Sequence, residues 1–181
     1  MPEYWPVVPR SDLAIAAATS SELDATLAVL DDAAAWLQQR GVDQWRAGQW
    51  KRERIGEAID RGEVHLARLD GAIVGTISLQ WSDEFFWPGW PLDAGYVHRL
   101  AVGAKWHGHA IGRALLEWAV RTSAAQGRTY VRLDCVCENA KLRSYYEGLR
   151  FTYRGERRRG PTWCAALYER PASAPMHCSA S

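Results

Sequence analysis

Apolar residues recur along the chain with two spacings, one typical of helices and the other of strands. Between residues 23 and 41, leucine and alanine repeat every three or four positions, which predicts a helix with one buried face that ends at Gly41. Asp70-Gly71 separates two apolar runs and is typical of a tight hairpin turn. The expected elements are strand 13–19, helix 23–41, helix 49–60, strands 64–69, 72–81 and 95–102, a helix ending near 126, strand 131–137, helix 139–146, and strands 151–157 and 162–168.

The order of these elements predicts the fold class. The order β-α-α-β-β-β-α-β-α-β-β combines antiparallel hairpins with crossover helices, so we expect a mixed sheet of the α/β (α+β) class. A chain of 181 residues suits one domain, which we place at residues 1–170. Residues 171–181 are rich in Ala, Ser and Pro, and we expect them to form a disordered tail.

The composition is typical of a folded globular protein. Apolar residue types make up 48% of the chain and charged types 24%, which are ordinary globular values. No run approaches the roughly 18 apolar residues that span a bilayer, and no basic leader precedes an apolar run near the start. The four cysteines contain no Cys-x-x-Cys pair, so we expect reduced thiols, no metal site and a cytoplasmic protein.

Charge is divided unevenly along the chain, although its net value is only +1. Residues 1–98 carry 8 Lys and Arg against 15 Asp and Glu, whereas residues 99–181 carry 14 against 6. Such a division is typical of a protein that binds an anion with one part and a cation with another. A fold that interleaves the two halves would weaken this signal.

The segment from Leu100 to Arg113 has the pattern of a strand that turns into a helix through small residues. Gly108, Ala110 and Gly112 would let the first backbone amides of the helix approach a diphosphate at the positive end of the helix dipole. Alternatively, the small residues only allow the helix to pack closely on the sheet. Asp134 lies 22 residues after Gly112, where a dinucleotide-binding fold has an acidic residue. Three strands precede this turn, however, and argue against that fold. The predicted cofactor-binding residues of this segment are Leu100, Ala101, Val102, His107, Gly108, His109, Ala110, Ile111, Gly112 and Arg113.

Two motifs carry a resemblance to a known superfamily. Residues 107–112 resemble the coenzyme A motif of the GCN5-related N-acetyltransferase (GNAT) superfamily, in which Gln or Arg is followed by x-x-Gly-x-Gly or Ala. His107 and Ala110 depart from the usual residues, and Gly112 matches. Residues 139–151 resemble the superfamily's later motif, an Asn that opens a Tyr-bearing helix and then Gly-Phe, with Arg150 in place of the glycine. The order of elements extends the resemblance over roughly residues 13–169.

The resemblance implies a GNAT-like acyl-CoA N-acyltransferase fold and direct transfer of an acetyl group from acetyl-CoA to an amine, without a metal. The backbone of Leu100 and Val102 would hold the pantetheine arm, and the Leu100 N–H would face the acetyl carbonyl oxygen. Tyr146 matches the tyrosine that protonates the departing thiolate. Asn139 and Arg143, from the same motif, would also contact the coenzyme. The alternative for Tyr146 is a purely structural role, as an aromatic side chain that packs on the sheet.

His98 is the predicted general base. It lies two residues before Leu100, and strand alternation would place Tyr96, His98, Leu100 and Val102 on one face. An ordinary imidazole has a pKa of about 6.5, which suits proton removal near neutrality. Two alternatives remain: a core histidine bound to a carbonyl group, and a water chain that ends at Asp or Glu. Cys135 is more typical of a small apolar core residue than of a nucleophile.

The acidic and aromatic part of the chain is expected to bind the acceptor amine. Carboxylates would attract a cation, and tryptophans would contact it through their ring faces. The predicted acceptor residues are Trp45, Asp83, Glu84, Trp87, Trp90, Asp93 and Tyr96. A tryptophan-rich loop over residues 82–91 could equally be a packed lid, and exposed tryptophans there would indicate a homodimer.

Overall likeness to antibiotic-modifying superfamily members favours a small cationic acceptor, and specifically an aminoglycoside such as kasugamycin at its 2'-amine. We expect neither a nucleic acid nor a membrane as partner. The alternatives are acetylation of a protein N-terminus or lysine, and a non-catalytic module that only binds coenzyme A.

Overall fold

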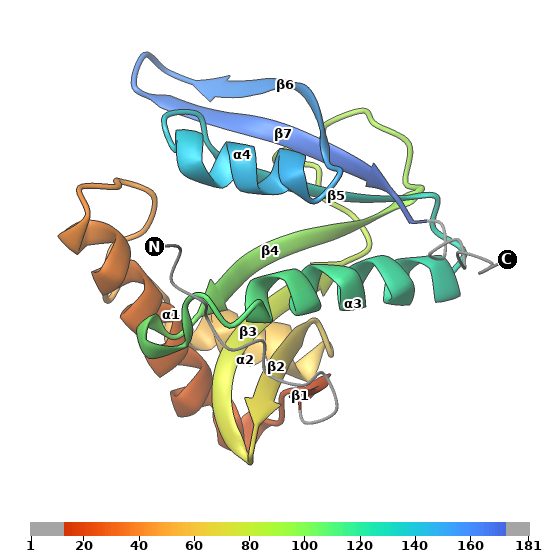
Figure 1. Ribbon diagram of the computed structural model, residues 1–181. Coiled ribbons are helices and arrows are strands. Elements are labelled where there is room, and N and C mark those ends of the chain that lie inside the picture. Colours follow the sequence, from red (N-terminus) through yellow and green to blue (C-terminus); the bar gives the residue numbers. More distant parts are fainter. Residues whose placement is uncertain (1–12, 173–181) are drawn as a thin grey trace, which may run out of the picture.

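The computed structural model describes residues 13–172, which form one seven-stranded mixed sheet with helices on both faces (Figure 1). The strand order is β1-β2-β3-β4-β5-β7-β6. The elements are β1 (Leu13–Ala17), α1 (Leu23–Gln39), α2 (Arg52–Asp60), β2 (Val64–Leu69), β3 (Ala72–Gln80), β4 (Ala94–Val102), α3 (Ile111–Ala125), β5 (Tyr130–Val136), α4 (Ala140–Gly148), β6 (Thr152–Arg159) and β7 (Trp163–Pro171), with short 3-10 helices at Ser20–Glu22 and Ala104–Trp106. The predicted order and class are confirmed, with boundaries that differ by a few residues.

The core has a separate layer on each face of the sheet. Residues such as Leu115 of α3 and Leu133 of β5 pack together with α4 on one face. Residues such as Leu30 of α1, Ile55 of α2 and Leu66 of β2 pack on the other face. The second face is completed beside β4 and β7 by the loop between β3 and β4. Each helix therefore buries one apolar stripe, as the spacing of leucine and alanine predicts.

β4 and β5 pair only where they begin. Their parallel ladder runs from Ala94 opposite Tyr130 to Val97 opposite Leu133. Beyond these residues the two strands separate, as Figure 1 shows between the green and teal arrows. Parallel strands that diverge leave unpaired backbone groups between them. The later half of β4 is therefore open to whatever lies between the strands.

A β-bulge in β4 overturns the predicted alternation of its side chains. The ladder between β3 and β4 shifts between Thr76 and Ser78, and Arg99 opposite this shift has a φ of 50°. The extra residue reverses the phase of the strand. Consequently Tyr96 packs on the face covered by the β3–β4 loop, whereas Leu100 and Val102 pack toward α3. The prediction that all four residues from Tyr96 to Val102 share one face was wrong.

Two further expectations change at the carboxyl end and at the cysteines. Pro171 is the last residue of β7, and Ala172 is buried with its N–H donated to the Thr129 carbonyl at 2.8 Å, so the domain extends past residue 170. The rest of the predicted tail lies outside the described residues. Cys137, the residue after β5, and Cys164 of β7 form a disulfide instead of staying as reduced thiols. No helix within residues 13–172 is long and apolar enough to cross a membrane.

Candidate active site

A cavity of about 600 Å³ opens where β4 and β5 separate. Its walls include His98 of β4 and Asp134 of β5, together with Asp83 from the β3–β4 loop. Trp45, from the segment between α1 and α2, lines the cavity on the face of the sheet that α1 and α2 cover. Tyr146 of α4 also lines it, although α4 packs on the opposite face. The cavity therefore joins the two faces through the gap between the strands.

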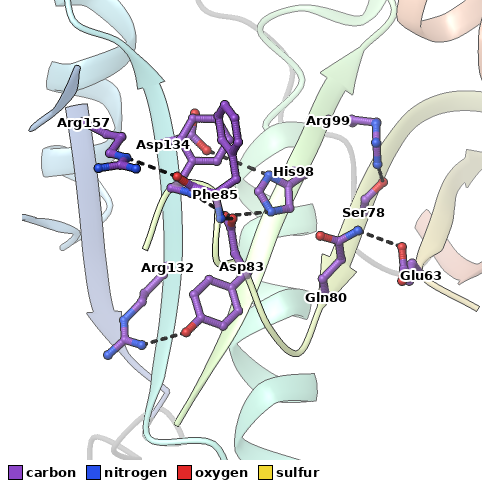
Figure 2. Close-up of polar contacts among 12 residues, drawn as sticks. Glu63, Ser78, Gln80, Asp83, Phe85, His98, Arg99, Arg132, Asp134 and Arg157 are labelled. Carbon is purple, nitrogen blue, oxygen red and sulfur yellow. Dashed lines mark hydrogen bonds and ion pairs between the residues drawn. The ribbon is translucent and has the colours of Figure 1, made fainter. Parts of the chain in front are cut away.

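His98 lies between two carboxylates in this cavity (Figure 2). Its Nε2 is 3.2 Å from Oδ2 of Asp83, and its Nδ1 is 3.9 Å from Oδ1 of Asp134. Asp83 is fixed because its Oδ1 accepts the backbone N–H groups of Phe85 and Phe86, both at 3.0 Å. The imidazole is therefore oriented by a carboxylate that the loop itself holds in place.

The two carboxyl groups differ in their protonation. Burial alone would raise the pKa of Asp83, but hydrogen bonds from His98 and from the Phe86 N–H outweigh it and lower this pKa below the ordinary value. Burial raises the pKa of Asp134 to about 7, with His98 opposing the rise and Asp83 adding to it. Asp83 is thus ionised at neutral pH, while Asp134 is near its midpoint.

The ionised Asp83 determines which nitrogen of His98 carries the proton. A carboxylate only accepts hydrogen bonds, so Asp83, 3.2 Å from Nε2, favours the neutral tautomer that carries its N–H on Nε2. The lone pair is then on Nδ1, on the side of Asp134. His98 can accept a proton at Nδ1, and the resulting imidazolium is stabilised by the carboxylate of Asp83.

Tyr146 is a buried phenol that lines the same cavity. Burial raises the pKa of Tyr146 well above its ordinary value, with contributions from nearby Cys135 and Asp134. Among residues 13–172, none makes a hydrogen bond to its hydroxyl group. A protonated phenol without a fixed partner can donate its proton to a departing anion. The adjacent Tyr145 is exposed and lies beside Gly112.

The start of α3 forms a separate cradle beside Leu100 and Val102. A second cavity, of about 470 Å³, is lined by these two residues together with Gly108, Ala110 and Gly112. The first amides of α3 precede its first internal hydrogen bond, from Ala114 N–H to the Ala110 carbonyl at 3.0 Å, and so remain available to an anion.

Close packing at this cradle explains why small residues are needed there. A Cβ on Gly112 would lie 3.1 Å from the Tyr145 hydroxyl oxygen. Ala110 has a φ of 58°, a left-handed conformation that glycine adopts more readily than alanine. Arg150, the other departure from the glycine motifs, has a φ of 67°. Both departures therefore place a side chain where the backbone favours glycine.

Several predicted cofactor residues have other partners. His107 Nε2 lies 2.9 Å from the Val102 carbonyl, and His109 Nδ1 lies 3.1 Å from the His107 carbonyl, so both rings bind their own loop. Arg143 donates to the Tyr168 hydroxyl at 3.0 Å and lines neither of the two cavities described above. The remaining predicted residues lie as follows: Ala101 is buried under α1, Ile111 is in the α3 core, Arg113 is exposed on the first turn of α3, and Asn139 caps α4 and donates to Gln44.

Five of the seven predicted acceptor residues do not line the cavity. Trp87 and Tyr96 are buried, and Trp90 packs against them. Asp93 pairs with the buried Arg132 at 2.9 Å. Arg132 also binds Glu169 at 2.8 Å, and its guanidinium lies over the rings of Trp87 and Trp90. These residues are turned away from the cavity because a buried guanidinium needs carboxylates and aromatic faces around it. Glu84 is exposed outside the cavity, whereas Trp45 and Asp83 line it.

Asp134 and Arg99 line the cavity and were not predicted as site residues. Asp134 is the one carboxylate within β5, whose other residues are mostly apolar, and that signal could have identified it. The position of Arg99 depends on the bulge, which the sequence pattern does not reveal. Burial raises the pKa of the free Cys135 thiol to about 12, so it is a poor nucleophile, in line with its expected core role.

The model of the acetyltransferase (GNAT) family matches residues 28–151. The chain belongs to this family. The chain is 28% identical over 130 residues to the uncharacterized N-acetyltransferase YesJ of Bacillus subtilis, which covers 67% of this chain and 72% of that protein. The GNAT enzymes use acetyl-CoA as co-substrate, and this chain is an acetyl-CoA-dependent N-acetyltransferase.

Solved structures share the fold at low sequence identity. An acetyltransferase of the GNAT family from Listeria monocytogenes aligns with a TM-score of 0.75 and 23% identity, over 88% of this chain and 94% of that one. YncA from Salmonella typhimurium, solved with acetyl-CoA, aligns with a TM-score of 0.67 and 15% identity, over 93% and 100%. The ribosomal-protein-S18-alanine N-acetyltransferase of Escherichia coli aligns with a TM-score of 0.67 and 20% identity, over 93% and 99%.

The geometry of this chain suits the co-substrate of its family. The amides at the start of α3 and the small residues before them can hold a diphosphate, and the gap between β4 and β5 leads from there to His98. Leu100 lines both cavities, so it lies where they meet. A thioester held by this strand would therefore be accessible from the cavity that contains His98 and Tyr146.

Proposed function

We propose that this GNAT enzyme acetylates the amine of a small molecule that enters the cavity from the face covered by α1, α2 and the β3–β4 loop. One observation carries the proposal: a single cavity joins a carboxylate-oriented His98 to the buried hydroxyl of Tyr146 through the separated strands. A base and an acid placed at opposite sides of one reaction path are what amine acetylation requires.

The residues divide the proton transfers between them. Acetyl-CoA supplies the acetyl thioester. His98 takes a proton from the acceptor ammonium at Nδ1, and Asp83 stabilises the positive charge on the ring. The freed amine nitrogen forms the new C–N bond as the C–S bond breaks, and Tyr146 gives its hydroxyl proton to the departing sulfur. The nitrogen loses its second proton to solvent as the amide forms, solvent returns one proton to Tyr146, and His98 releases its proton, so each cycle yields the amide, coenzyme A and one H+.

The backbone supplies the remaining stabilisation. We assign the Leu100 N–H to the acetyl oxygen, where negative charge develops during transfer, and the first amides of α3 to the diphosphate. Both assignments rest on the family motif and on the place of Leu100 between the two cavities.

The cavity favours a small acceptor with an apolar part. Its volume of about 600 Å³ lies within the usual range for small-molecule sites, and Trp45, Trp50 and Phe86 supply aromatic surface. An aminoglycoside, suggested by overall likeness, gains no support from the relatives described above. Arg54 and Arg99 also line the cavity and would repel a polycation. We therefore propose a small amine without assigning it to that antibiotic class.

Acetylation of a protein N-terminus or lysine is the second candidate. It is favoured by the structural similarity to a ribosomal-protein-alanine N-acetyltransferase. A protein acceptor would have to thread its terminus past Trp45, Phe85 and Phe86 at the cavity wall. Peptides and small amines can be compared directly in the same assay.

The test is thiol release from acetyl-CoA with panels of small amines, polyamines, aminoglycosides and peptides. The proposal predicts that the wild-type enzyme acetylates small amines. It also predicts that Tyr146→Phe lowers kcat on the order of 10²-fold while the variant still binds coenzyme A. Tyr153→Phe removes an exposed hydroxyl on β6 and serves as the matched control. Turnover of peptides alone would favour the second candidate, and no turnover with any amine would indicate a non-catalytic coenzyme A-binding module.

A further inference from the structure

Arg99 lines the cavity that contains His98 and has no ion-pair partner among residues 13–172. Its guanidinium donates to the Ser78 hydroxyl at 3.4 Å, as Figure 2 shows. Within the described part of the chain, no carboxylate oxygen lies within 4.0 Å of it. A half-buried guanidinium normally has a carboxylate or several acceptors around it. Of the five N–H donors in its planar fork, the described residues engage one, through this long hydrogen bond.

The carboxylate that acts most on Arg99 is engaged elsewhere. Glu63 binds both Nε and Nη2 of Arg61, at 2.7 and 3.1 Å, and also accepts from the Gln80 amide at 2.7 Å. Burial lowers the pKa of Arg99, with Arg61 and Arg54 acting in the same direction and Glu63 opposing them. The charge of Arg99 is thus only partly compensated by the protein.

The cavity has two chemically different regions. One contains His98, Asp83 and Asp134, and suits an amine. The other contains Arg99 and, from α2, the exposed Arg54, and suits an anion. The bulge in β4 creates this arrangement, because it leaves the consecutive residues His98 and Arg99 on the wall of the same cavity. Arg99 keeps a left-handed φ of 50° in doing so, a conformation that costs free energy in any non-glycine residue.

We propose that the acceptor is an amine that also bears a carboxylate, as an amino acid does, and that Arg99 binds this carboxylate while His98 faces the amine. The inference rests on the proposed function and specifies its substrate class. A guanidinium matches a carboxylate with two parallel hydrogen bonds, which provides orientation as well as affinity. Trp45, Trp50 and Phe86 leave room for an apolar side chain on the same acceptor.

The experiment compares acceptors that differ only in the carboxylate. Each L-amino acid, its amide and its decarboxylated amine, for example phenylalanine, phenylalaninamide and phenethylamine, is incubated with acetyl-CoA and the wild-type enzyme. We expect kcat/KM for the preferred amino acid to exceed that of its amide and amine on the order of 10²-fold, because the alternatives leave Arg99 without a partner. The difference should be mainly in KM.

Variants of Arg99 assign the effect to this residue. Asparagine adopts a left-handed φ more readily than most non-glycine residues, so Arg99→Asn removes the charge without adding strain to the bulge. It should raise KM for the amino acid on the order of 10²-fold and leave KM for the decarboxylated amine within a few fold, and Arg99→Lys should be intermediate. Arg121→Gln removes an exposed charge on α3 and is the matched control.

The outcomes separate this inference from the proposed function. If amines are acetylated but the carboxylate gives no advantage, or if Arg99→Asn affects both members of a pair equally, the carboxylate site is refuted and the proposed function stands. If no small amine in any panel is acetylated, the proposed function itself fails. Calorimetric titration of the coenzyme A-loaded protein with the same amino acids provides a readout independent of turnover, and equal affinity for acid and amide would also refute the site.

Discussion

Replacing Asp134 by asparagine is expected to stabilise the protein above neutral pH and to have a much smaller effect in acid. Asp134 lies in the cavity wall of β5 and makes no contact with His98 closer than 3.9 Å. Its carboxyl group is buried and its pKa is raised from the ordinary 3.8 to about 7. Asparagine has nearly the same shape but carries no charge at any pH, so the substitution removes only the cost of ionising this group.

The magnitude follows from the two protonation equilibria. Between pH 3.8 and pH 7 the folded protein holds a proton on Asp134 that the unfolded chain has released. The folded state binds more protons over this range, so the free energy of unfolding falls as pH rises. A difference of about 3 pKa units at 1.36 kcal/mol each amounts to about 4 kcal/mol, all of it present above pH 7. The advantage of Asp134→Asn should therefore grow by about 3 kcal/mol between pH 5 and pH 8.

Urea unfolding followed by tryptophan fluorescence at several values between pH 5 and pH 9 measures this difference. Titrating groups that do not interact with Asp134 contribute equally to both proteins, so they cancel when the two curves are subtracted. A difference that stays constant over this range would refute the assignment of a raised pKa to Asp134. A variant that becomes less stable than the wild type as pH rises would show that the ionised carboxylate of Asp134 stabilises the fold and does not destabilise it.

Three further substitutions test other parts of the structure. His98→Ala should lower kcat on the order of 10²-fold or more while coenzyme A binding is retained, and added imidazole should restore part of the rate; a variant as fast as the wild type at every pH would remove His98 from its role. Ala110→Gly relieves a left-handed φ and should raise the free energy of unfolding by about 1 kcal/mol, whereas Ala114→Gly inside α3 should lower it by about the same amount. Arg132→Met leaves Asp93 without its cation and Glu169 with only Arg154 at 3.5 Å, and should cost about 3 to 5 kcal/mol in urea unfolding, against at most about 1 kcal/mol for Arg158→Met in an exposed pair.

The loop between β3 and β4 shows why the acceptor site was only partly predictable. Its tryptophans were expected to meet the acceptor because they are large, apolar and close to acidic residues in the sequence. In the structure they surround Arg132, which belongs to a strand about 40 residues later. No local pattern reveals that a particular arginine will be buried beneath a distant loop. Asp83 alone among the loop carboxylates turns into the cavity, because its side chain caps the backbone amides that follow it.

The amino-acid sequence by itself determined the order of the elements, the turn at Asp70-Gly71 and the small residues at the start of α3. These features depend on residues within a few positions of one another, where spacing and backbone preference act directly. Only the tertiary structure decided that His98 would lie between Asp83 and Asp134, that Arg99 would line the same cavity, and that Cys137 would meet Cys164. The first two of these contacts depend on where β4 bulges and where it separates from β5. The sequence pattern does not reveal them, because strand register is set by packing between segments far apart in the chain.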